Sequence, residues 1–98
     1  MDKRYSILQK NFNECYVCGA KINLHIHEVF YGTSNRKKSI EDGCCIKLCG
    51  KHHNLSKEGI HFNRELDLQI KKEMETKWLY HYKKTKEDFI KRYGKNYL

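Results

Sequence analysis

The chain contains no proline and no run of apolar residues long enough to cross a membrane. A membrane-spanning helix needs about 20 consecutive apolar residues, so the sequence predicts no such helix. Residues 1–10 are polar and charged and lack the apolar segment of a secretory signal peptide, which predicts a cytoplasmic protein. The absence of proline by itself decides nothing about the fold.

Internal repeats and low-complexity linkers are also absent, which predicts a single domain over residues 1–98. Hydrophobic residues make up 39% of the chain and charged residues 33%, so the core is expected to be thin. Domains this small commonly need disulfides or a bound metal for stability. The cysteines number five, which is odd, and in an intracellular chain spaced cysteines more often bind metal than form disulfides.

Acidic residues are scarce relative to basic ones, with 12 Asp and Glu against 20 Lys and Arg and a formal net charge of +8. A small domain with this excess suits a polyanionic partner, and nucleic acid is the favoured one. An anionic membrane surface is the weaker alternative, because the basic residues do not gather on one amphipathic helix.

Two pairs of potential metal ligands share the same spacing. Cys15 and Cys18 form a Cys-x-x-Cys pair, and Cys49 and His52 form a Cys-x-x-His pair. A tight turn directs both ligands of a pair toward one ion, and a tetrahedral Zn²⁺ needs two such pairs. We therefore expect these residues to bind one structural zinc ion, with unliganded buried cysteines as the alternative.

The segments around these pairs have the patterns of strands and loops. Residues 22–30 alternate apolar and polar side chains, and residues 44–48 form a short apolar run, so two β-strands are predicted. The two cysteines that begin the second strand are expected to be small core residues, with a substituted metal ligand as the alternative. Residues 31–43 are rich in Gly, Ser, Asn, Lys and Arg and predict a loop. Residues 49–56 are expected to form a turn or short helix, and residues 1–13 a short helix or an arm.

The last third of the chain has helical periodicity. Apolar residues that recur at every fourth position, and that are expected to enter the core, are Leu66, Ile70, Met74, Trp78 and Tyr82. Asn63 is a suitable N-cap for this helix. A second helix is predicted over residues 86–93. Thr85 and Asp88 can form a capping box at its start, and Gly94 can end it in the left-handed conformation.

Histidines are numerous, and most lie near the predicted metal-binding elements. His25 and His27 share one face of the first predicted strand, and Glu28 points to the opposite face. A histidine beside a carboxylate can supply a general base and a metal ligand, although surface polar residues on an edge strand have the same pattern. His53 directly follows the zinc ligand, and His61 lies a turn or two further along the chain.

Together these residues resemble HNH endonucleases that have a zinc-knuckle scaffold. The motifs that carry the resemblance are Cys15-x-x-Cys18-Gly19, Ile26-His27-Glu28-Val29-Phe30 and Leu48-Cys49-x-x-His52-His53-Asn54. Residues 63–68 and 93–98 are similar to those of small phage and prophage members of the group. The resemblance therefore extends over nearly the full chain.

The resemblance implies an α+β fold with a small zinc-stapled ββα-metal core, the HNH or His-Me finger, over residues 15–62. A pair of C-terminal helices follows over residues 63–98. It also implies hydrolysis of DNA phosphodiester bonds with a divalent metal such as Mg²⁺, Mn²⁺, Ni²⁺ or Zn²⁺. The implied location is the cytoplasm of a bacterium or of a phage-infected host cell, and cleavage of both DNA strands would favour a homodimer.

Carried over position by position, the resemblance implies that His53 binds the catalytic metal, with His61 as a candidate additional ligand or phosphate contact. The family's first-strand pair corresponds to His27 and Glu28, but its second member is usually the histidine base, whereas this chain has Glu28 there. Two assignments remain open. His27 can be the base while Glu28 supports the metal, which we favour because imidazole needs less adjustment of its pKa, or the roles can be reversed.

The middle asparagine of the family motif is replaced by Cys44, and Asn35 is expected to substitute for it, with Arg36 on the phosphate. The candidate contacts to nucleic acid are Asn35, Arg36, Lys37, Lys38 and Asn54. Two other functions remain as alternatives. One is a zinc-dependent nucleic-acid-binding module without catalysis, and the other is a protein-interaction module that uses the helix over residues 66–82.

Overall fold

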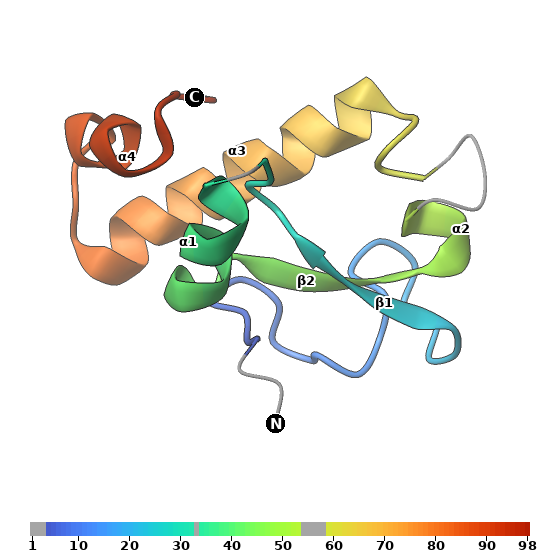
Figure 1. The fold of residues 1–98 in the computed structure, drawn as a ribbon. Coiled ribbons are helices and arrows are strands. Elements are labelled where there is room, and N and C mark those ends of the chain that lie inside the picture. The colour runs from blue at the N-terminus through green and yellow to red at the C-terminus, as the bar shows by residue number, and fades with distance from the viewer. Residues whose placement is uncertain (1–3, 33, 54–58) are drawn as a thin grey trace.

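Two strands and four helices make up the part of the chain that the structure describes, which is residues 4–32, 34–53 and 59–98. The structure is a computed structural model. In chain order the elements are β1 (Leu24–Glu28), α1 (Asn35–Asp42), β2 (Cys45–Cys49), α2 (Gly50–His53), α3 (Arg64–Tyr82) and α4 (Lys86–Tyr93). The chain therefore has a small α+β fold with a two-stranded sheet and helices, as the sequence predicts (Figure 1).

The strands β1 and β2 pair antiparallel, with Leu24 opposite Cys49 and Glu28 opposite Cys45. Both predicted strands are present, but β1 is shorter than predicted. Asn23, directly before it, has a left-handed φ of 56°, which interrupts extended backbone at that point. The pairing brings the start of β1 next to the end of β2, and that end leads directly into α2.

The prediction of a loop over residues 31–43 is wrong for residues 35–42, which form α1. The buried residue of this helix is Ser39, whose hydroxyl donates to Phe30 O at 2.6 Å and accepts from Phe30 N–H at 3.1 Å. Gly43 ends the helix with a φ of 74°. Polar contacts therefore hold α1 in place, and an apolar stripe that could predict it is missing from its sequence.

The helical prediction for the last third of the chain is confirmed. Asn63 accepts a hydrogen bond from Leu66 N–H at 3.1 Å as the N-cap of α3, and Thr85 and Asp88 form the capping box of α4. Gly94 ends α4 with a φ of 83°. The buried members of the predicted stripe are Ile70, Met74 and Trp78.

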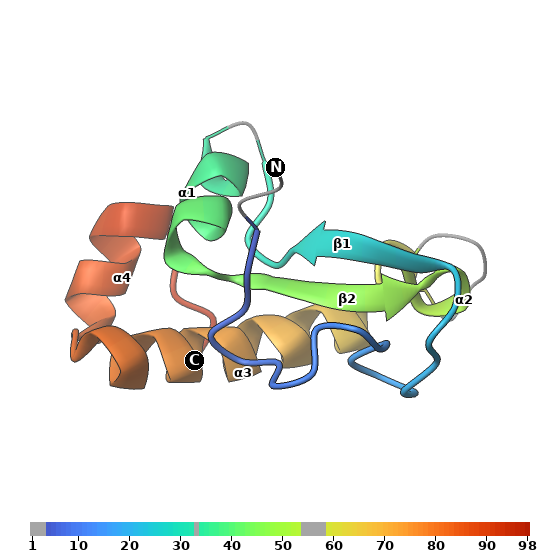
Figure 2. The ribbon, with the colours of Figure 1, turned by 90° about the horizontal axis from the view of Figure 1, so that it is seen from below.

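Helix α3 runs along the length of the β1–β2 hairpin, with α1 and α4 at one end and α2 at the other (Figures 1 and 2). Side chains from the strand region and the helices form one core, which includes Phe30, Ile46, Leu48, Ile70, Met74, Trp78, Phe89 and Tyr93. None of the described helices is both long and apolar enough to span a membrane.

Residues 4–13 form an arm without a helix, and this arm positions the first cysteine pair. The Gln9 side chain accepts a hydrogen bond from Lys47 N–H at 2.8 Å, and Tyr16 N–H donates to Lys47 O at 2.8 Å. The turn that contains the first two cysteines is thereby held beside β2. The expected turn or helix after β2 is α2, and the rest of that prediction, residues 54–56, lies outside the described residues.

Candidate metal centres

The two ligand pairs predicted from their spacing come together where β2 ends. Cys18 Sγ lies 3.7 Å from Cys49 Sγ, and His52 Nδ1 lies 3.3 Å from Cys49 Sγ and 3.8 Å from Cys15 Sγ. Ligand atoms about 2.0–2.3 Å from a tetrahedral Zn²⁺ are about 3.3–3.8 Å apart, so these distances are close to what one zinc ion requires. Cys15, Cys18, Cys49 and His52 therefore form a candidate metal site that is consistent with zinc.

Local backbone structure holds the ligands of this site in place. Gly19 N–H donates to Cys15 O at 2.9 Å and closes the turn, and Gly19 has a left-handed φ of 78° that suits a glycine. Cys49 is the last residue of β2, and His52 lies within α2, which begins at the next residue. The turn thus presents two ligands, and the end of β2 and helix α2 present one each.

The backbone also favours the charge state that binds metal. Burial opposes ionisation of Cys15, but hydrogen bonds from the backbone at Cys49, Cys18 and Val17 outweigh it and lower the pKa of the thiol to about 6. The thiolate is the form of cysteine that binds zinc. At Cys44 burial outweighs the other influences and raises the pKa of the thiol, which agrees with the expected core role of this residue.

A second metal-capable group consists of His27, His53 and His61, whose ligand atoms lie within 4.8 Å of one another. The three imidazoles come from β1, from α2 and from the segment before α3. Their ring centroids are 5.2 Å apart for His27 and His61, 5.4 Å for His27 and His53, and 4.8 Å for His53 and His61. The rings therefore form a nearly equilateral triangle.

Within this group His27 has an environment that suits a metal ligand. Its side chain is 3% exposed, and its Nε2 atom is buried without a hydrogen-bond partner in the described part of the chain. Burial, followed by the nearby charges of His53 and His61, lowers the pKa of His27 to about 3. The imidazole is therefore neutral at physiological pH, and a bound cation would satisfy its unpartnered nitrogen.

The three histidines open into a cavity of about 180 Å³. The residues that line it are Ile26, His27, Glu28, Tyr31, Arg36, His53 and His61. Helix α3 supports one wall, because Tyr31 OH donates to Asp67 Oδ2 at 3.2 Å and Lys71 Nζ donates to the same oxygen at 2.9 Å. The cavity is small, and its polar lining combines imidazoles, one carboxylate and one guanidinium group.

Glu28 lies beside the metal-capable group rather than within it. Its carboxylate lines the cavity, and its Oε1 accepts a hydrogen bond from Arg4 at 3.3 Å. Among the described residues the group contains His27 and not Glu28, and the sequence left both residues open as ligands of the second metal. The other predicted ligands of the second metal, His53 and His61, are brought together as expected.

The predicted contacts to nucleic acid fall into two groups. Arg36 lines the cavity and Lys37 is exposed on α1. Asn35 and Lys38 instead donate from their side chains to backbone carbonyls at the end of α4, at 3.0 and 2.6 Å. Asn54 lies outside the described residues. Of the predicted contacts on α1, Arg36 and Lys37 are therefore the exposed cations.

The sequence did not assign a role to His25, which the structure places against the second metal-capable group. His25 Nδ1 lies 3.0 Å from His53 Nδ1. The strand alternation does put His25 on the same face as His27, so the signal was present. It gave no reason to pair His25 with His53, because that contact depends on how α2 folds back onto β1.

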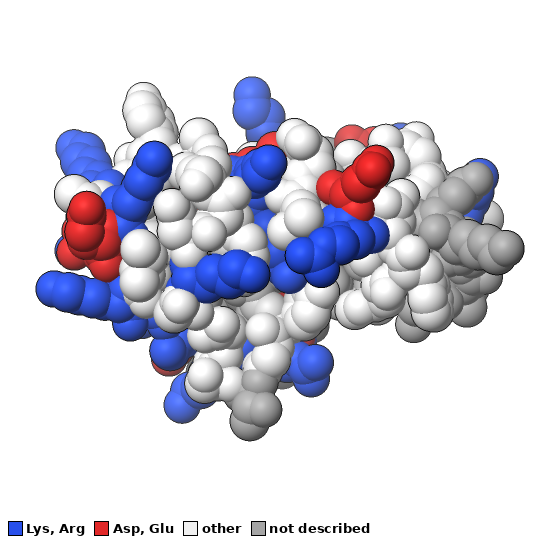
Figure 3. Space-filling model, turned by 90° about the horizontal axis from the view of Figure 1, so that it is seen from above, with Lys and Arg blue, Asp and Glu red and all other residues white. Residues whose placement is uncertain are grey.

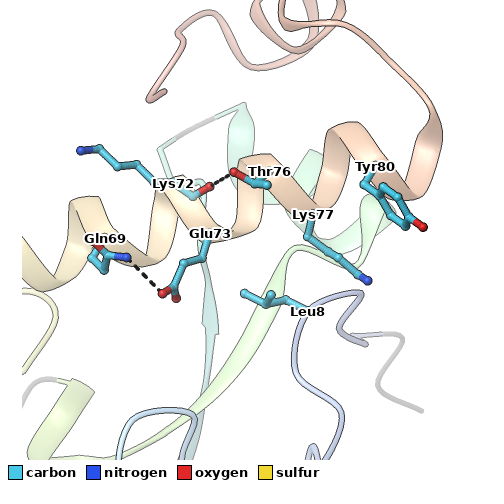
Figure 4. Close-up of a pocket in the computed structure, with 7 residues that line it drawn as sticks. All are labelled: Leu8, Gln69, Lys72, Glu73, Thr76, Lys77 and Tyr80. Atoms are coloured by element: carbon cyan, nitrogen blue, oxygen red, sulfur yellow. Dashed lines mark hydrogen bonds between the residues drawn. The ribbon is translucent and has the colours of Figure 1, made fainter.

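A larger cavity of about 490 Å³ lies along α3, away from the histidines (Figure 4). Leu8 from the N-terminal arm faces α3 across it. Its carboxylate, Glu73, is occupied by hydrogen bonds from Tyr16 at 2.8 Å and Gln69 at 3.1 Å. This cavity therefore offers no group of metal ligands among its described lining residues.

The described chain thus has two metal-capable groups that meet at consecutive residues, His52 in one and His53 in the other. No protein-family model, no curated protein and no solved structure matches the chain.

Proposed function

We propose that the chain is a metal-dependent HNH-type endonuclease that hydrolyses DNA phosphodiester bonds, with β1, β2 and α2 as its ββα-metal core. The observation that carries the proposal is the group His27, His53 and His61 in a cavity directly beside the candidate zinc site. Four ligands complete a structural zinc site, whereas three leave positions open for water and substrate. The second group has three ligands, which is the number typical of an open site.

Three neutral imidazoles suit a divalent transition metal, and such an ion when bound offsets the negative charge that develops on a phosphate during in-line displacement. The protein residues hold the ion and orient the reactants. Arg36 lines the cavity beside the histidines and is placed to bind a phosphate oxygen. The exposed Lys37 on the same helix extends this positive charge.

The geometry supports the second of the two assignments that the sequence leaves open, in which Glu28 is the base. His27 is nearly inaccessible, and a base whose pKa is about 3 accepts a proton from water poorly. The Glu28 side chain is 14% exposed and lines the same cavity. In this proposal His27 therefore binds the metal and the Glu28 carboxylate takes a proton from the attacking water.

The charge distribution supports a polyanionic partner. Lys and Arg side chains are spread across the face shown in Figure 3, and acidic side chains occur there only in a few groups. With a formal net charge of +8, the surface would attract a DNA backbone and release counterions on binding.

A plasmid-nicking assay with Mg²⁺, Mn²⁺, Ni²⁺ or Zn²⁺ tests the proposal. We expect the double variant His27→Ala, His53→Ala to lose at least about 100-fold in cleavage rate, because loss of outer-shell partners alone commonly costs about 10- to 100-fold. The matched control is His81→Ala, which removes an exposed histidine on α3. Equal cleavage by wild type and the double variant would show that the histidine group is not the active site.

One observation favours a non-catalytic, zinc-dependent nucleic-acid-binding module as the second candidate. Cys44, which stands in place of the family's middle asparagine, is fully buried and accepts a contact from Tyr93 OH at 3.7 Å, so it faces the core. This candidate predicts salt-sensitive DNA binding that is unchanged in His27→Ala and Glu28→Ala, without cleavage by wild type. Filter binding at several salt concentrations, run beside the nicking assay, distinguishes the two.

A further inference from the structure

We propose that His25 is a positioning residue, which accepts a hydrogen bond from Nδ1–H of His53 and so directs the Nε2 lone pair of His53 toward the second metal. The inference rests on the metal site of the proposed function, but it does not depend on the cleavage reaction. It assigns a role to the one histidine on β1 that neither metal-capable group contains.

The two nitrogens of the His53 ring have different neighbours. Its Nδ1 lies 3.0 Å from His25 Nδ1, and its Nε2 lies 3.2 Å from His61 Nε2. Two imidazole nitrogens on one tetrahedral ion, each about 2.0–2.1 Å from it, are about 3.3 Å apart. The Nε2 side of His53 therefore has the spacing of a metal ligand.

The protonation states follow from this assignment. A neutral imidazole has one N–H and one lone pair, so a His53 ring that binds metal through Nε2 carries its proton on Nδ1. The Nδ1 atom of His25 is the hydrogen-bond partner at that position, and it must therefore be the acceptor. The proton of His25 is then on its own Nε2.

The fold holds His25 in the orientation that this role requires. It lies on β1 opposite Leu48, two residues before His27 and on the same face of the strand. Its side chain is half-buried. The His25 and His53 rings are perpendicular, at 89°, with centroids 5.1 Å apart. Metal-binding histidines commonly donate their second nitrogen to a carboxylate, carbonyl or water, and here an imidazole takes that place.

Metal titrations of variants test the role without relying on activity. The chain is first loaded with one equivalent of Zn²⁺ to fill the cysteine site and is then titrated with Co²⁺ against a competing chelator. We expect His25→Phe, which keeps a ring but lacks the acceptor, to weaken binding of the second ion by about 10- to 100-fold. His25→Gln, which restores an acceptor, should recover part of the loss, and His81→Phe should bind as wild type does.

A second measurement uses the unmodified chain, so it does not depend on whether a variant folds. Long-range ¹H–¹⁵N NMR spectra of the protein with two equivalents of Zn²⁺ report which nitrogen of each ring is protonated. We expect protonation of His53 at Nδ1 and of His25 at Nε2. Coordination of His53 through Nδ1, or an affinity of His25→Phe equal to that of wild type, would overturn the inference.

The nicking assay tests the proposed function separately from the role of His25. If wild type binds the second ion with these protonation states but cuts no DNA, the nuclease proposal fails and the role of His25 stands. If wild type binds only one ion per chain, the role of His25 fails.

Discussion

The two metal-capable groups meet at consecutive residues of the chain and differ in the type and number of their ligands. The first combines three cysteines with His52 and has four ligands, at the end of β2. The second has three imidazoles and lines a cavity that also contains a carboxylate and a guanidinium group. Saturated thiolate coordination suits a structural ion, whereas an unsaturated imidazole site suits chemistry.

In this small domain one short helix contributes a ligand to each of the two metal-capable groups. Helix α2 is four residues long, and it contains both His52 and His53. Because consecutive side chains on a helix are about 100° apart, the two rings are directed to different sites. A zinc ion on His52 would thus fix the direction of His53, so the structural site also positions the candidate catalytic one.

The strongest test of this difference removes one cysteine of the first group. We expect Cys49→Ala to lose zinc and unfold, because structural zinc contributes on the order of 10 kcal/mol to the folding of such domains. The matched control is Cys44→Ala, which removes a buried thiol outside both groups and should retain zinc. Zinc content by mass spectrometry and circular dichroism check both variants, and a folded, zinc-free Cys49→Ala would contradict the structural role.

The helical end of the molecule, where the described residues include no metal-capable group, should be sensitive to a different change. Asp42 accepts hydrogen bonds from Trp78 Nε1 at 2.9 Å and from Arg92 Nη2 and Tyr93 OH at 2.8 Å each, and so joins α1 to α3 and α4. We expect Asp42→Asn to cost about 2 kcal/mol in the free energy of unfolding, because the half-buried guanidinium group of Arg92 loses its charge partner. Urea denaturation measures it.

The control for that prediction is Glu41→Gln, whose carboxylate is exposed and contacts the same arginine at 3.3 Å. An exposed pair contributes little, so its free energy of unfolding should change by less than about 1 kcal/mol. Zinc content should be normal in both variants. Equal effects of the two substitutions would indicate that the Asp42 network does not hold the helical end together.

The smallest expected effect concerns Glu75, a fully buried carboxylate on α3. Burial raises the pKa of Glu75 above its usual value of 4.5, although Tyr97 N–H donates to it at 2.7 Å. The folded state therefore binds this proton more tightly than the unfolded state does, and the resulting stability is present below pH 4.5 and is lost as the pH rises through the raised pKa.

Glu75→Gln removes this pH dependence. We compare the free energy of unfolding of the variant with that of wild type at two pH values. On going from about pH 4.5 to pH 8, this difference should shift by about 1 kcal/mol in favour of the variant. Urea denaturation of both proteins at several pH values measures the gap, and the zinc contribution cancels because both chains contain the same ligands. A gap that widens as the pH falls would contradict the sign of the shift.

The sequence predicted the parts of the molecule whose determinants are local. The spacing of Cys15, Cys18, Cys49 and His52 was sufficient for the first site, and the four-residue repeat with its caps was sufficient for α3 and α4. Helix α1 was missed because the hydroxyl of Ser39 and contacts to α4 hold it, and neither appears as a periodic apolar pattern.

The second site was predicted only in part, because its members meet through tertiary contacts. His53 and His61 were named as ligands on the resemblance to HNH endonucleases, and the structure groups them with His27. The partner that His53 finds in His25 depends on how α2 packs against β1, which the spacing in the sequence does not specify.

The metal stoichiometry measured by native mass spectrometry tests the central claim most directly. We expect two ions per chain for wild type after titration with a divalent transition metal, and one ion for His53→Ala, with the cysteine site still filled. One ion per chain in wild type, or the same two ions in His53→Ala, would contradict the claim that neighbouring histidines serve two separate metal sites.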